Sequence, residues 1–182
     1  MSLPNVLTIC RIAAIPAIVV LVVLGSTAAL WIALALYIAA AVTDYIDGAL
    51  ARRMNLSSNL GRMLDPIADK MLVGALIVTF AATGQIAGWD LAPALAILMR
   101  EIFVAGLREF LGEKQVTLHV STLAKYKTAA QLVAIGAVLL AGLVPEIGLV
   151  ADLLLWLAAA LTVWTGYHYL SGAWGALTVT VK

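Results

Sequence analysis

Six long apolar runs constrain the fold of this chain most, because each is about as long as a helix that crosses a lipid bilayer. The runs cover residues 6–24, 28–49, 64–82, 91–111, 124–143 and 147–170. Hydrophobic residues make up 64% of the 182 residues and charged residues only 12%, which is unlike a soluble globular domain. The sequence therefore predicts an all-α integral membrane protein, a bundle of six transmembrane helices that forms a single domain over residues 1–182.

The charges between these runs predict how the bundle is oriented. Basic residues gather in the segments 52–62 and 108–127, whereas the other three connecting segments contain none. By the positive-inside rule, the two basic segments and both termini are expected to be cytoplasmic. The net charge is only +1 and there is no basic low-complexity run, so we expect no nucleic-acid partner.

Four aspartates lie at the cytoplasmic ends of the second and third predicted spans. Asp44 and Asp47 are three residues apart and share a helix face, and Asp65 and Asp69 are four apart on the next helix. Clustered carboxylates in a membrane segment indicate a function. Oxygen ligands without nearby His or Cys favour Mg²⁺ or Mn²⁺, and a pair of such ions is a recurrent arrangement in phosphoryl chemistry. We therefore expect all four aspartates to bind metal, two ions in total, with Asp69 the natural general base.

Residues beside the aspartates fit a phosphate ligand. Arg52 lies two turns after Asp44, where a guanidinium is placed to bind a diphosphate in a bidentate way. Gly48 and Gly61 remove side chains from the facing surfaces and allow a ligand or a helix to approach closely. Pro66 suits the first turn of a helix, so the third span is expected to begin there. A single aspartate near a helix end is usually a cap or a solvated residue, but four on two matched stripes cannot all be caps.

The same positions resemble a known family signature. The matching residues are Asp44, Asp47, Gly48, Ala51, Arg52, Gly61, Asp65 and Asp69. Their identities and spacing are similar to the signature of the CDP-alcohol phosphotransferases. The resemblance implies transfer of a phosphoalcohol group from a CDP-linked donor to a second alcohol, with two divalent ions on the diphosphate. It implies that Asp69 takes the proton of the attacking hydroxyl and that CDP is bound by Asn5, Thr8, Gly48, Ala51, Arg52 and Gly61.

Further stretches narrow the acceptor. Residues 4–11, 64–70, 100–102, 107–109 and 125–131 resemble the branch of the family that uses CDP-diacylglycerol and glycerol 3-phosphate. The phosphate of such an acceptor needs cations of its own, and the predicted ones are Arg100, Arg108, Lys125 and Lys127. The alternative is that these residues only mark the cytoplasmic ends of spans.

Other functions remain open at this stage. The same chemistry with another acceptor is one alternative, with phosphatidylglycerol as in a cardiolipin synthase, serine or inositol phosphate in that role. A divalent-metal transporter is a remote one, because the acids gather at one face and no inverted repeat is visible. The basic segments place the active site on the cytoplasmic side, and we expect the membrane to be a bacterial inner membrane. By analogy with the family, a homodimer is expected to be possible.

Overall fold

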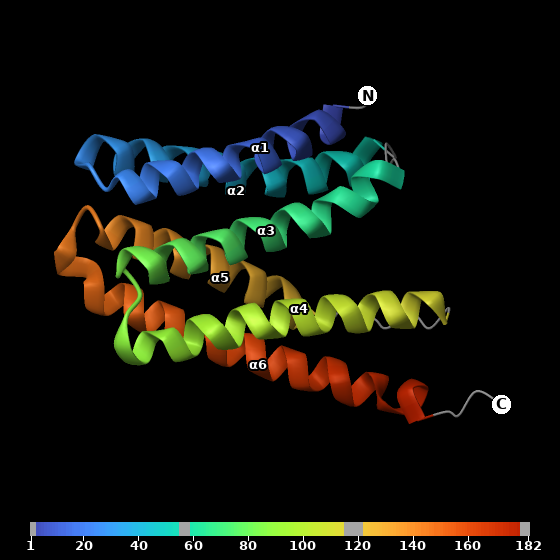
Figure 1. Cartoon of the computed structure of the whole chain (residues 1–182). Coiled ribbons are helices and arrows are strands. Elements are labelled where there is room, and N and C mark those ends of the chain that lie inside the picture. Colours follow the sequence, from blue (N-terminus) through green and yellow to red (C-terminus); the bar gives the residue numbers. More distant parts are fainter. Residues whose placement is uncertain (1–2, 55–58, 115–121, 179–182) are drawn as a thin grey trace.

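Six long helices account for most of the chain in a computed structural model that describes residues 3–54, 59–114 and 122–178 (Figure 1). Side chains are described in these ranges except at 3–4, 44–54, 59–60, 62, 113, 122–125, 176 and 178. The helices are α1 (Leu3–Leu24), α2 (Thr27–Met54), α3 (Asn59–Thr83), α4 (Leu91–Glu113), α5 (Thr122–Ala141) and α6 (Gly148–Thr178). Two short 3-10 helices, η1 (Gly88–Asp90) and η2 (Pro145–Ile147), precede α4 and α6. The predicted all-α fold of six helices is confirmed.

The two helices that carry the aspartates are longer than their apolar runs. Helix α2 continues to Met54 and α3 already begins at Asn59, a residue type favoured at helix starts. Pro66 therefore lies inside α3, and the expectation that the third helix begins at Pro66 is wrong. The residues from Leu60 to Leu64 are mostly good helix formers, and membrane helices tolerate an interior proline.

The helices run up and down, so the beginning of α1 and the end of α6 lie at the same end of the bundle (Figure 1). The end of α2, the beginning of α3 and the end of α4 lie there too. Helix α1 packs against α2 and α3, and α6 packs against α4 and α5. These two three-helix groups meet where α5 contacts α2 and α3 and where α4 contacts α3.

Tight turns close the opposite end of the bundle. Gly25 joins α1 to α2 with a φ of 65°, and Gly84 follows α3 with a φ of 77°. Only glycine adopts such values without steric cost, so these two residues allow neighbouring helices to return directly along each other. The end of α2 and the beginning of α3, which carry the predicted aspartates, lie at the other end (Figure 1).

The core runs between the two helix groups, and the outer surface is also apolar. Phe80 and Leu76 of α3 are fully buried together with residues of α1, α4, α5 and α6, namely Ile18, Ile97, Ile135 and Leu155. Large apolar side chains are nevertheless exposed on every helix, for example Val20, Val78 and Leu153 at 56%, 58% and 62%. A soluble monomer rarely exposes so much apolar surface, and a membrane protein turns it toward lipid.

Among the described residues, three helical stretches are long and apolar enough to cross a bilayer: Asn5–Leu24, Met63–Thr83 and Pro145–Gly175. Two shorter apolar stretches lie at Thr27–Thr43 and Tyr126–Ala141. Helix α4 contains five charged residues, namely Arg100, Glu101, Arg108, Glu109 and Glu113. The apolar helices are those of a membrane protein, and the charged residues of α4 lie among them.

Candidate active site

The predicted metal-binding aspartates lie on the last turns of α2 and the first turns of α3. Both stretches are helical, as the spacing of the aspartates predicts. The end of α2 and the beginning of α3 lie at the same end of the bundle as the beginning of α1 (Figure 1). The structure does not describe the side chains of residues 44–54. The prediction that Asp44, Asp47, Gly48, Ala51 and Arg52 face the aspartates of α3 therefore stays a prediction.

Asp65 is exposed and is held by a residue of α1. The hydroxyl of Thr8 donates a hydrogen bond of 2.7 Å to Oδ1 of Asp65. Thr8 is only 1% exposed, and Asn5 and Arg11 on the same face of α1 are buried as well. Helix α1 thus supports the predicted metal site from inside the bundle. Thr8, predicted to bind the nucleotide, contacts a predicted metal ligand.

Asp69 lies one turn after Asp65 and is partly buried. Its carboxylate is close enough to interact electrostatically with the ammonium of Lys127 on α5 and with the phenol of Tyr37 on α2. Tyr37 in turn donates a hydrogen bond of 2.6 Å to the carbonyl of Leu132 on α5. The predicted general base therefore faces the region where the two helix groups meet.

Lys127 belongs to a buried cluster that centres on Glu101 of α4. Oε1 of Glu101 accepts hydrogen bonds from Nζ of Lys127 at 2.5 Å, Nη1 of Arg100 at 3.0 Å and Nε2 of Gln131 at 3.2 Å. Glu101, Lys127 and Gln131 are 8%, 4% and 2% exposed. Charge-assisted hydrogen bonds of this kind are strong where water is excluded. The cluster therefore fixes two of the predicted acceptor cations, Arg100 and Lys127, beside one carboxylate.

Two threonines of α6 complete this cluster. Thr162 accepts a hydrogen bond from Gln131 at 2.9 Å, and Thr165 accepts one from Nη2 of Arg100 at 3.1 Å. Each threonine donates its own hydroxyl to a carbonyl of α6, of Ala158 and Thr162 respectively. The hydrogen bonds thus link α4, α5 and α6. We call this set the Glu101 cluster; its members are Arg100, Glu101, Lys127, Gln131, Thr162 and Thr165.

The other two predicted acceptor cations are not part of the Glu101 cluster as described. Arg108 is exposed, and its guanidinium lies over the ring of Tyr169 and donates a 3.3 Å hydrogen bond to the hydroxyl of that tyrosine. The side chain of Lys125 lies outside the described ones. The role predicted for Arg108 and Lys125, binding of the acceptor phosphate together with Arg100 and Lys127, therefore stays a prediction.

Sequence reasoning missed four members of the cluster as site residues: Glu101, Gln131, Thr162 and Thr165. Gln131 lies one turn after Lys127, a spacing that puts both on one helix face. Thr162 and Thr165 are the polar residues in an otherwise apolar stretch of α6, which is a signal of an internal contact in a membrane helix. Their partners are 31 and 65 residues away, so no local pattern identifies them.

The described acids fit a divalent ion by chemistry. Asp65 and Asp69 offer carboxylate oxygens one helical turn apart, which suits Mg²⁺ or Mn²⁺ and not zinc. Where side chains are described, no group of three or more His, Cys, Asp or Glu forms a metal site. Asp44 and Asp47, predicted to complete the site, have side chains outside the described ones.

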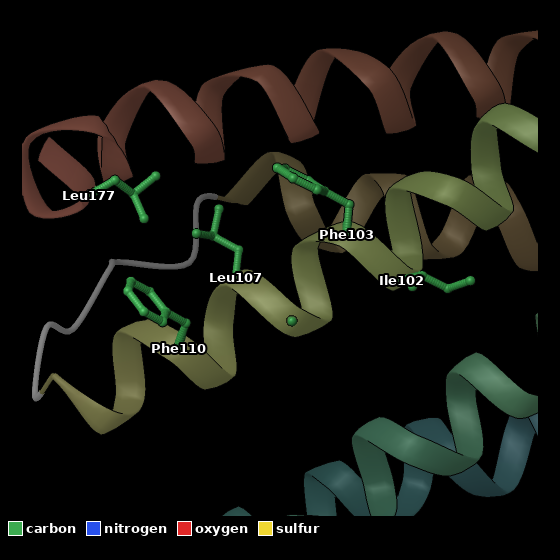
Figure 2. Close-up of a pocket in the computed structure, with 6 residues that line it drawn as sticks. Ile102, Phe103, Leu107, Phe110 and Leu177 are labelled. Carbon is green, nitrogen blue, oxygen red and sulfur yellow. The ribbon is translucent and has the colours of Figure 1, made fainter.

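An apolar pocket of about 510 Å³ lies between α4 and α6, apart from these polar groups (Figure 2). Phe103 and Leu107 rise from α4 toward α6, which contributes Leu177. The remaining lining residues are Ile102, Gly106 and Phe110. This lining offers no group that could bind an ion or transfer a proton.

Comparison with known proteins agrees with the motifs. The sequence model of a family described as CDP-alcohol phosphatidyltransferase matches residues 1–164. Three similar curated proteins are each named CDP-diacylglycerol–glycerol-3-phosphate 3-phosphatidyltransferase. The one from Rickettsia bellii is 45% identical, over 92% of this chain and 93% of its own length. Those from Bacillus subtilis and Shigella flexneri are both 38% identical, over 97% and 94% of this chain and the same shares of their own lengths. The similarity thus spans both helix groups.

Proposed function

The chain belongs to the CDP-alcohol phosphatidyltransferase family, and on this basis we propose that it transfers the phosphatidyl group of CDP-diacylglycerol to glycerol 3-phosphate. The products are phosphatidylglycerol phosphate and CMP. The relatives named for this activity support the proposal. The structural observation that carries it is the pair of cations, Arg100 and Lys127, held at one buried carboxylate, because a phosphorylated acceptor needs positive charge of its own.

The acceptor presents two chemical demands. Its hydroxyl must lose a proton as it attacks, and Asp69 accepts that proton as general base. Its phosphate needs positive charge, which Lys127 and Arg100 supply through charge-assisted hydrogen bonds. Glu101 offsets one of these two positive charges and leaves one for the phosphate. Holding the phosphate there keeps the hydroxyl next to Asp69, and such positioning lowers the barrier.

The donor is proposed to bind at the end of α2 and the beginning of α3. Asp44, Asp47, Asp65 and Asp69 would hold two Mg²⁺ or Mn²⁺ ions, and neutralisation of charge at the diphosphate is the chemistry that such ions supply when bound. Thr8 keeps the carboxylate of Asp65 in place through its hydrogen bond. The remaining proposed nucleotide contacts are Asn5, Gly48, Ala51, Arg52 and Gly61.

We further propose that residues 1–182 form a single domain with six spans, in a bacterial inner membrane, with both termini and the active site on the cytoplasmic side. The up-and-down arrangement supports this, because the segments richest in Lys and Arg connect helices at the same end of the bundle as the beginning of α1 and the end of α6 (Figure 1). At this interface the acyl chains of the donor stay in lipid while its headgroup reaches the aspartates.

An acceptor panel tests the proposal directly. Purified protein with CDP-diacylglycerol and Mg²⁺ is expected to release CMP with glycerol 3-phosphate and not with serine, inositol phosphate or phosphatidylglycerol. Thin-layer separation of the lipid product identifies phosphatidylglycerol phosphate. Release with one of the other acceptors alone would retain the donor site and refute the assignment of the acceptor.

Replacing Lys127 by alanine is expected to raise the KM for glycerol 3-phosphate about 10- to 100-fold, the effect of losing one charged hydrogen-bond partner. The KM for CDP-diacylglycerol should change much less, because Lys127 lies on α5 and not beside the proposed nucleotide contacts. Steady-state kinetics with each substrate varied in turn gives both values. Lys114→Ala is the matched control, since Lys114 is exposed and lies over the ring of Phe110. Equal effects on the two KM values would exclude an acceptor role for Lys127.

A further inference from the structure

The side chain of Arg100 crosses α6 at Gly166. A Cβ atom built on Gly166 would lie 3.0 Å from Cγ of Arg100, 3.3 Å from its Nε and 3.7 Å from its Cδ. Contacts of 3.0–3.4 Å are tighter than nine in ten real Cβ contacts, so with a side chain at position 166 the stem of Arg100 would have to shift by a few tenths of an ångström. Because Gly166 has no side chain, the aliphatic part of the Arg100 side chain can pass close to the backbone of α6.

The guanidinium end of Arg100 is fixed by Thr165, the residue before Gly166. The single hydroxyl hydrogen of Thr165 is donated to the carbonyl of Thr162 at 3.0 Å, so its oxygen is left to accept from Nη2 of Arg100. Nη1 of the same guanidinium is held by Glu101. Two hydrogen bonds from different helices thus determine the plane of the guanidinium.

Arg100 is consequently held at both ends. Its Cγ is close to the backbone of α4 and cannot move far, and its terminal nitrogens are each engaged. A methyl group at position 166 would press on the stem between these two ends, and a shift of the stem would lengthen or bend the hydrogen bond to Thr165 or to Glu101. Each terminal nitrogen has two hydrogens and gives one to these partners, so the fixed plane presents the others to an anion.

We propose that Gly166 and Thr165 of α6 are positioning residues that orient Arg100 for the phosphate of a phosphorylated acceptor alcohol. The proposal rests on the proposed function, in which Arg100 binds that phosphate. Helix α6 contributes no lysine or arginine of its own. It acts on substrate affinity by determining where an arginine of α4 lies.

Gly166→Ala is expected to raise the KM for glycerol 3-phosphate about tenfold, as for one misplaced charge-assisted hydrogen bond. The KM for CDP-diacylglycerol and kcat should stay within about twofold, because neither the aspartates nor the proposed nucleotide contacts move. Gly172→Ala is the matched control: it makes the same change on the same helix, at a position where a Cβ meets nothing within 4 Å. That variant should keep both KM values of the wild type.

A second pair of variants separates positioning from a loss of packing. Thr165→Val keeps the shape and removes the oxygen that accepts from Arg100, whereas Thr165→Ser keeps the oxygen. Thr165→Val should raise the KM for glycerol 3-phosphate, and Thr165→Ser should keep the KM of the wild type. This pair tests the proposal even when Gly166→Ala does not fold.

The outcomes distinguish this proposal from the proposed function. If the wild type turns over glycerol 3-phosphate but Gly166→Ala and Thr165→Val match their controls in KM, or change kcat alone, the positioning role is refuted and the function stands. If the wild type releases no CMP with glycerol 3-phosphate, the proposed function fails and the positioning role fails with it.

Discussion

Replacing Asp69 by asparagine is expected to lower kcat about a thousandfold, within the range that general-base catalysis contributes. An amide has nearly the same size as a carboxylate, but it cannot take the proton of the acceptor hydroxyl. It is also a poorer ligand for Mg²⁺ or Mn²⁺. CMP release at saturating concentrations of both substrates measures the loss, and circular dichroism checks that the helices remain.

Two asparagine variants are useful beside it. Asp152→Asn makes the same change near the beginning of α6, at the opposite end of the bundle, and should leave kcat unaltered. Asp65→Asn should raise the Mg²⁺ concentration needed for activity, and excess Mg²⁺ should restore part of kcat, because the proposed role of Asp65 is metal binding alone. If Asp69→Asn kept more than about a tenth of the wild-type kcat at all Mg²⁺ concentrations, general-base catalysis by Asp69 would be refuted.

Replacing Glu101 by alanine is expected to lower the free energy of unfolding by about 3–5 kcal/mol, the usual effect of removing one partner of a buried ion pair. The reason is that Lys127 and Arg100 would both lose the carboxylate that they contact, in a region where water cannot take its place. Denaturant unfolding in detergent micelles, followed by circular dichroism, measures the change.

The order of three variants tests this explanation. Lys127→Ala should be less destabilising than Glu101→Ala, because Glu101 keeps its contact with Arg100. Glu101→Gln should lie between them, since its carbonyl oxygen still accepts hydrogen bonds but carries no charge. Equal losses for Glu101→Ala and Lys127→Ala would mean that only the Lys127 pair matters and that the contact with Arg100 adds nothing to stability.

The fold was largely predictable because helix length in a membrane is dictated by the bilayer. Apolar runs predict all six helices, with ends within a few residues for α1, α4 and α5. The larger differences are at the end of α6, which reaches Thr178 where the apolar run ends at 170, and at the end of α2 and the beginning of α3. In α2 and α3, polar residues of the aspartate motif continue the helices. Hydropathy alone cannot predict these turns, because they lie outside the apolar runs.

The site was predictable only in part. The residue types at Asp65, Asp69, Arg100 and Lys127 indicate their chemistry, and their charge makes them conspicuous in an apolar chain. The partners that orient them are less conspicuous: Thr8, Thr165 and Gly166 are small residues that act through contacts between helices far apart in sequence. Such contacts depend on how α1 packs on α3 and α4 on α6, which no local spacing specifies.

The meeting of two three-helix groups has a consequence for how acceptor choice can change. The aspartates all lie on α2 and α3, whereas the Glu101 cluster lies entirely on α4, α5 and α6. The proposed donor and acceptor sites would therefore lie in separate, continuous halves of the chain. With the sites proposed here, substitutions confined to the second half are expected to redirect the reaction toward another alcohol while the first half continues to bind the same nucleotide. A chimaera joined within the connection between α3 and α4 would exchange acceptors as a unit.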